Sequence, residues 1–278
     1  MEWWLAPFEL GFQQRALIGG MLAALMASTV GTWLVLRGMS FFGDAFVHGV
    51  IPGVAAAVVL DINPLLGAAV AAATIVFAIE LVQRKTVLGE DTSIGLLFVG
   101  MLALGVVIIS RLDSYSGSLT SILFGDALGV TWDDIAGQLV VLAIVVIVSA
   151  VLYRPLIALS LSRDKAELLG MRPGLAHAAL LVLIALAVIG SYQSVGTLLV
   201  FGLLVGPPAT ASLLSRTISR MMLIAALIGV VSVWLGLTIS YYWGTAASAT
   251  MALVPIVLFF AVLSVKNVVE SARARVSV

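Results

Sequence analysis

Cysteine is absent from this chain of 278 residues. Disulfide bonds, iron–sulfur clusters and thiolate ligands for a metal ion are therefore excluded. Any metal ion that the protein handles must be bound by oxygen atoms or by imidazole nitrogen, and the chain has only two histidines.

Charged side chains are scarce. They make up 10% of the residues, and 62% of the residues are hydrophobic, whereas roughly a quarter of the residues in a soluble domain are charged. Runs such as 139–151 and 178–189 lie inside apolar stretches of the ~20 residues that a helix needs to cross a bilayer. Barrel strands would instead alternate polar and apolar residues. The composition predicts an all-α membrane protein, and a net charge of zero gives no sign of a nucleic-acid partner.

The chain also has no Gly-x-x-x-x-Gly-Lys-Ser/Thr phosphate loop and no polar segment long enough to form an ATP-binding domain. We therefore expect a transport protein and not an enzyme. If ATP drives the transport, a separate chain must hydrolyse it.

Apolar runs bounded by charges, glycine or proline predict one transmembrane domain over 1–278, with a helix bundle over 12–266. Nine spans are expected: 15–36, 41–60, 62–82, 93–110, 134–153, 174–192, 195–215, 220–242 and 247–265. Glycines and prolines at 202–208 interrupt the seventh, which we expect to be broken or re-entrant, so that eight spans are the alternative.

Basic residues collect on alternate connections, as the positive-inside rule requires when the spans are counted correctly. Twelve of the 14 lysines and arginines lie on one set of connections and ends, and only Arg15 and Arg111 lie on the other. This asymmetry predicts an odd number of crossings, with the N-terminus outside. The C-terminal segment 267–278 is then a cytoplasmic tail. We expect the protein to lie in a bacterial inner membrane.

The cytoplasmic connection 154–173 has the pattern of a short charged helix. It contains Asp164 and Glu167, and Gly170 and Pro173 are expected to end the helix. A helix in this place is a natural docking element for a soluble partner.

Asp44 and His48 are two ionisable residues within the second predicted span. They stand four residues apart, so on a helix both project from one face. A carboxylate inside a span costs at least ~2.5–3.5 kcal/mol on insertion, so such a residue usually faces a partner, a cavity or a substrate path. Together the two side chains form an oxygen and nitrogen pair suited to Mn²⁺, Zn²⁺ or Fe²⁺. Alternatively, Asp44 caps the span and His48 forms a hydrogen bond to a neighbouring helix.

Two ligands are too few to select a metal ion. A second copy of the chain, packed about a symmetry axis, would supply two more. The other histidine, His177, has no carboxylate at helical spacing, and we expect it to be structural.

Several motifs resemble those of the membrane subunits of manganese, zinc and iron ABC importers, a branch related to the vitamin B12 and iron-siderophore permeases. The resemblance covers about 15–265. The motifs are Val35–Ala45 followed by His48 and by Pro52 and Gly53, then Glu90–Gly95, Leu123–Asp126, Val195–Val200 and Pro207–Ala211.

The resemblance implies a polytopic permease that passes a divalent metal ion and holds no permanent cofactor. It implies a complex of two permease copies, two cytoplasmic ATPase subunits and an external metal-binding protein. It places Asp44 and His48 on the metal path, and it identifies 158–170, with Asp164, Glu167 and Gly170, as the helix that couples the permease to the ATPase. The loop that contains Leu123–Asp126 favours manganese or iron over zinc.

In one place the chain departs from this family. Relatives commonly carry an aspartate and then Ser-Gly after the Ser-Tyr-Tyr of the eighth span, whereas this chain has Trp243, Gly244 and Thr245 there. We therefore place no ligand at that position. Two other functions stay open: a proton-coupled secondary transporter, and an ABC importer for a metal chelate or vitamin.

Overall fold

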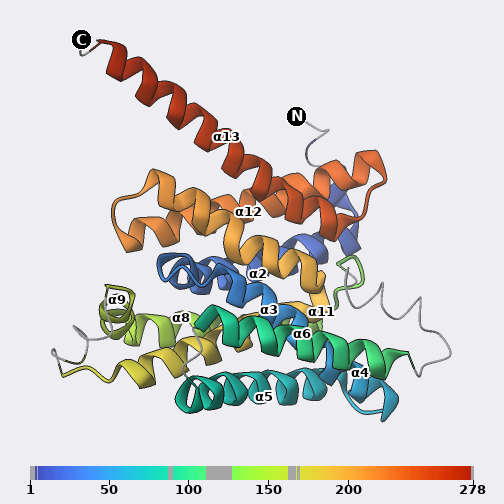
Figure 1. The fold of residues 1–278 in the computed structure, drawn as a ribbon. Coiled ribbons are helices and arrows are strands. Elements are labelled where there is room, and N and C mark those ends of the chain that lie inside the picture. Colours follow the sequence, from blue (N-terminus) through green and yellow to red (C-terminus); the bar gives the residue numbers. More distant parts are fainter. Residues whose placement is uncertain are drawn as a thin grey trace.

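The computed structural model describes residues 4, 6–86, 90–110, 127–161, 167 and 170–276. Within these ranges the chain forms helices and no strand, which confirms the predicted all-α class (Figure 1). The elements are η1 (Ala6–Glu9), α2 (Gly11–Leu36), α3 (Ser40–Gly49), α4 (Ile51–Val59), α5 (Pro64–Lys85), α6 (Glu90–Ile109), α8 (Trp132–Val151), α9 (Tyr153–Leu161), α11 (Pro173–Leu214), α12 (Ile218–Trp243) and α13 (Ala247–Val276).

Seven helical segments of the described chain are long and apolar enough to cross a membrane. Two shorter apolar stretches, Thr92–Ile108 and Leu199–Leu214, coincide with the other two predicted spans. The total of nine crossings stays a prediction. The expected tail is largely helical, because α13 runs on to Val276. No glycine or proline follows Pro255 to end this helix.

The centre of the bundle is formed by α2, which packs against α11, α12 and α8. In α2, and also in the span made by α3 and α4, 67% of the apolar stretch is buried, against 22% in α8 and in α13. The outer helices present large apolar side chains, among them Leu139, Val140, Phe260 and Val265. Such a surface suits hydrocarbon and not water.

The long helix α11 reverses direction at Gly196. Its first turn lies beside the end of α2, because His177 contacts Arg37, and Gly190 packs against Val141 of α8. After the reversal, Ala211 packs beside Leu36, again at the end of α2. Gly196 has φ 73° and ψ 166°, a conformation that is essentially restricted to glycine. The break therefore precedes the predicted interruption at 202–208, and the helix continues through Pro207 and Pro208.

The second span is interrupted at Val50, which ends α3 and precedes α4. Pro52 follows in the first turn of α4. Proline has no backbone N–H, and its ring clashes with the carbonyl group four residues earlier, here that of His48. The span is therefore two helices, and α3 carries both candidate ligands.

Helices α4 and α5 touch backbone to backbone where Gly53 meets Gly67. A Cβ atom on Gly67 would overlap the Gly53 carbonyl oxygen and come within 2.6 Å of the Cβ of Ala57. Small residues allow this kind of close helix crossing in membrane proteins.

Replacing Gly67 with Ala is expected to destabilise the folded protein by about 1–3 kcal/mol, the usual range for overpacking. The matched control is Gly137→Ala in α8, where a Cβ atom meets nothing within 4 Å. The control should be neutral or stabilising, because alanine favours helix over glycine by about 1 kcal/mol. The temperature at which each purified variant aggregates on heating measures its stability. Equal temperatures for the two variants would contradict the close crossing.

Candidate functional site

Asp44 and His48 lie on one face of α3, as their spacing predicts. The Nε2 atom of His48 is 3.4 Å from the Oδ1 atom of Asp44. The helix begins directly after a turn in which Gly38 has φ 68°, a left-handed conformation that suits glycine. This turn follows the end of α2, so the chain enters the second span only two helical turns before His48.

The separation of the two atoms fits two ligands of one ion. It exceeds the usual N–H···O hydrogen-bond range of about 2.7–3.2 Å. Two atoms about 2.1 Å from a metal ion, at a tetrahedral angle, lie about 3.4 Å apart. The pair could therefore hold a cation between its nitrogen and its oxygen without rearrangement of α3.

Apolar side chains surround the base of the pair. Phe42 and Phe46 of α3 are fully buried, and Gly43 lies against Leu204 of α11. The side chains of His48 and Asp44 keep 22% and 26% of their surface exposed. One side of the pair is thus sealed by the bundle, and the other side is open to an ion or to another chain.

The described residues contain no group of three or more histidine, aspartate or glutamate side chains that could hold a metal ion. One copy of the chain therefore offers two of the ligands that a four- to six-coordinate ion needs. The remaining ligands have to come from water or from another chain.

The predicted coupling residues are only partly described. Asp164 lies outside the described residues. Glu167 is helical and exposed, and its carbonyl group accepts a hydrogen bond of 2.9 Å from the N–H group of Gly170. Gly170 has φ 70°. Glycine in this conformation commonly ends a helix, as the sequence predicts.

His177 is buried at the start of α11, with 7% of its surface exposed. Its Nδ1 atom is 2.8 Å from Nη1 of Arg37. Because a guanidinium group can only donate, Nδ1 accepts this hydrogen bond. The contact joins α11 to the end of α2, which fits the structural role expected for this histidine.

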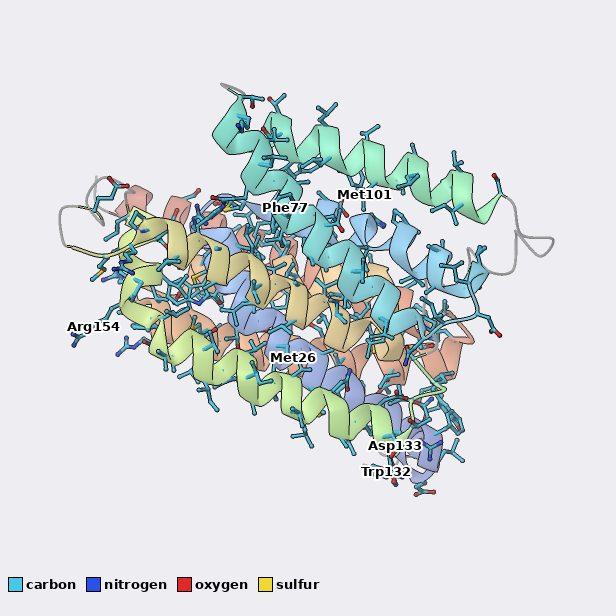
Figure 2. The ribbon with its side chains drawn as sticks, turned by 90° about the horizontal axis from the view of Figure 1, so that it is seen from below. Met26, Phe77, Met101, Trp132, Asp133 and Arg154 are labelled. Atoms are coloured by element: carbon cyan, nitrogen blue, oxygen red, sulfur yellow. The ribbon has the colours of Figure 1, made fainter. Side chains whose placement is uncertain are left out.

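The two ends of the bundle differ in charge. Figure 2 places Asp133, at the start of α8, and Arg154, just beyond its end, at opposite ends of the bundle. Arg15, which lies on the acidic side, donates a hydrogen bond of 2.7 Å from Nε to the carbonyl oxygen of Val130. Arg15, one of the two basic residues on this side, therefore forms a hydrogen bond to the residues just before α8.

Sequence reasoning missed one residue beside the pair. Phe98 of α6 lies with its ring centroid 6.1 Å from that of His48. Phe98 is the one aromatic residue of α6, but the sequence does not indicate which helix it meets.

Known proteins resemble this chain over most of its length. The model of the ABC 3 transport family matches residues 9–266. The manganese transport system membrane protein MntC of Listeria innocua is 35% identical over 252 residues, which are 91% of this chain and 90% of that protein. The manganese import system permease protein ScaB of Streptococcus parasanguinis is 37% identical over 251 residues, 90% of this chain and 89% of that protein.

A solved structure is also similar. The structure of PsaBC from Streptococcus pneumoniae in complex with Fab matches with a TM-score of 0.83 and 31% identity, over 94% of each chain. A family model that spans most of the chain, relatives above 30% identity and a shared fold lead to the same result. The chain belongs to the ABC 3 transport family.

Proposed function

We propose that this chain is the membrane-spanning subunit of an ABC importer that passes a divalent transition-metal ion to the cytoplasm. Manganese is the favoured ion, with zinc or iron as alternatives. The observation that carries the proposal is the Asp44 and His48 pair, at a ligand-to-ligand distance of 3.4 Å on a partly exposed face of a central span. It occurs in a chain that two manganese permeases match over about nine-tenths of its length.

The ligand set suits manganese. A carboxylate oxygen and a neutral imidazole are acceptable ligands for Mn²⁺, and the absence of cysteine removes the thiolate ligands that favour zinc. Affinity alone does not identify the ion, because the same ligands bind zinc more tightly than manganese. The rate of transport, and not the affinity, is therefore the quantity to compare between metals.

A second copy of the chain would complete the site. The exposed side of the pair and the small number of ligands in one copy both support a homodimer, in which two copies of Asp44 and His48 face a shared path. The dimer would bind two ATPase subunits through 154–173 and receive the ion from an external binding protein.

The orientation follows from charge. By the positive-inside rule the Arg154 end of the bundle would face the cytoplasm and the Asp133 end would face outward. The N-terminus would then lie outside and the C-terminus inside. The ATPase would then meet the bundle on the side where the chain places Glu167 and Gly170.

An importer for a chelate or vitamin is the less favoured alternative. A large ligand would need a wide polar or aromatic-lined cavity on the path, whereas each copy offers one oxygen and nitrogen pair that suits a bare ion.

Transport by the reconstituted complex tests the proposal against a proton-coupled carrier. Vesicles that contain the permease, its ATPase and the external binding protein are expected to accumulate manganese only when ATP is supplied on the ATPase side. Collapse of the proton gradient should leave this uptake unchanged. Uptake without ATP that stops when the gradient collapses would favour the secondary transporter.

A further inference from the structure

The imidazole ring of the candidate ligand His48 is oriented in an unusual way. Histidines that bind metals almost always donate their second ring N–H to a carboxylate, a carbonyl group or water, which fixes the ring orientation. Within the described ranges, the polar contact of His48 is the one from Nε2 to Asp44, and no hydrogen bond holds Nδ1. Within the protein, packing is the contact that orients the ring.

Phe98 of α6 supplies that packing. Its ring is tilted by 56° to the imidazole, with centroids 6.1 Å apart. The Phe98 ring also meets Phe41 edge to face, with centroids 5.9 Å apart and an interplanar angle of 75°. Phe41 and His48 are seven residues apart on α3, so they lie on the same face with Asp44 between them. Phe98 thus contacts two of the side chains on this face of α3 and leaves the pair partly exposed.

Contacts on either side of Phe98 hold α6 close to α3. Phe41 also reaches Gly95 of α6, where a Cβ atom would lie 3.9 Å from Cε1 of Phe41. One turn beyond Phe98, Met101 lies 4.0 Å from the position of a Cβ atom on Gly49, the residue after His48. Helix α6 therefore follows α3 closely on both sides of the imidazole.

We propose that Phe98 is a positioning residue that holds the His48 imidazole in its metal-binding orientation over Asp44. The inference rests on the proposed function of this pair. The aromatic ring has no polar atom to compete for the ion or for a proton, so it restricts the imidazole and leaves both ring nitrogens available. Edge-to-face and tilted ring contacts have a preferred geometry, which an aliphatic side chain of similar volume does not reproduce.

Manganese binding to the purified permease and ATPase complex, without the binding protein, tests this role. The probe is Mn²⁺ alone, and the electron paramagnetic resonance signal of the free ion reports binding. Phe98→Leu is expected to raise the Kd about tenfold, the lower end of the usual effect of losing support for a metal-binding histidine. Phe98→Tyr keeps the ring and should restore the Kd to within about threefold of the parent protein, less than the smallest such effect.

The matched control is Phe77→Leu in the neighbouring helix α5 (Figure 2), where the side chain is 69% exposed. It should leave the Kd unchanged. An unchanged Kd in Phe98→Leu, or equal weakening by Leu and Tyr at position 98, would overturn the positioning role.

A parallel His48→Gln variant separates this inference from the proposed function. Weak binding in His48→Gln together with normal binding in Phe98→Leu would retain the metal pair and reject Phe98 as its support. Normal binding in His48→Gln would reject both.

Discussion

Asp44→Asn and His48→Gln are each expected to reduce metal uptake per assembled complex by more than roughly 100-fold. Loss of a ligand should exceed the ~10–100-fold effect of losing one of its supporting partners. Removal of the Asp44 charge should also ease membrane insertion, so the loss cannot arise at that step. The double variant should be little worse than either single variant, because neighbouring residues that share one ion couple strongly.

Uptake of manganese, zinc and iron is measured in the two single variants and in the double variant, normalised to assembled complex. Asp133→Asn, at the exposed start of α8, is the matched carboxylate control and should transport normally. His177→Gln is the matched histidine control. It removes the contact with Arg37. It should therefore lower the free energy of unfolding by ~1 kcal/mol, the contribution of a typical hydrogen bond, and leave transport per folded complex unchanged. Normal rates and an unchanged metal preference in His48→Gln would reject the ligand assignment.

Replacing both Glu167 and Gly170 with Leu is expected to reduce ATP-dependent uptake by about thirtyfold, which corresponds to the loss of about 2 kcal/mol at a central docking contact. The bundle should remain folded. Glu167 is exposed, and a Cβ atom on Gly170 would meet nothing within 4 Å. ATP hydrolysis by the complex should continue without transport.

Backbone strain at Gly170 needs a control of its own. Because φ is 70° there, a leucine adds about 1–2 kcal/mol of left-handed strain. Asparagine tolerates this conformation better, so Gly170→Asn separates strain from docking and should keep most of the uptake. Asp164→Leu extends the test along the same segment. Normal transport in the Glu167 and Gly170 double variant would move the ATPase contact to another connection.

The sequence predicts the helices of this fold well because their ends are chemically marked. Pro64 and Pro173 stand at the first positions of α5 and α11, where a missing N–H does no harm. The break in α11 is less visible. Pro207 and Pro208 are stronger local signals than Gly196, yet tertiary packing keeps the helix intact through the prolines and requires a reversal at the glycine.

In the candidate site, too, one part could be predicted from the sequence and another could not. The spacing of Asp44 and His48 is a local property of one helix, so the sequence predicts that they share a face, and the distance of 3.4 Å confirms it. The position of Phe98 depends on how α6 packs against α3. Helical periodicity does not specify which helices become neighbours, and therefore the aromatic support of His48 could not be predicted from the sequence.

The backbone contact between Gly53 and Gly67 restricts how this protein can move. Because no side chain separates the two helices there, α4 cannot slide or roll against α5 without parting from it. The two helices should therefore travel as one rigid body during transport. The interruption at Val50 lies between this body and the candidate ligands. A hinge at that residue would let α3 tilt and release an ion while α4 and α5 keep their packing.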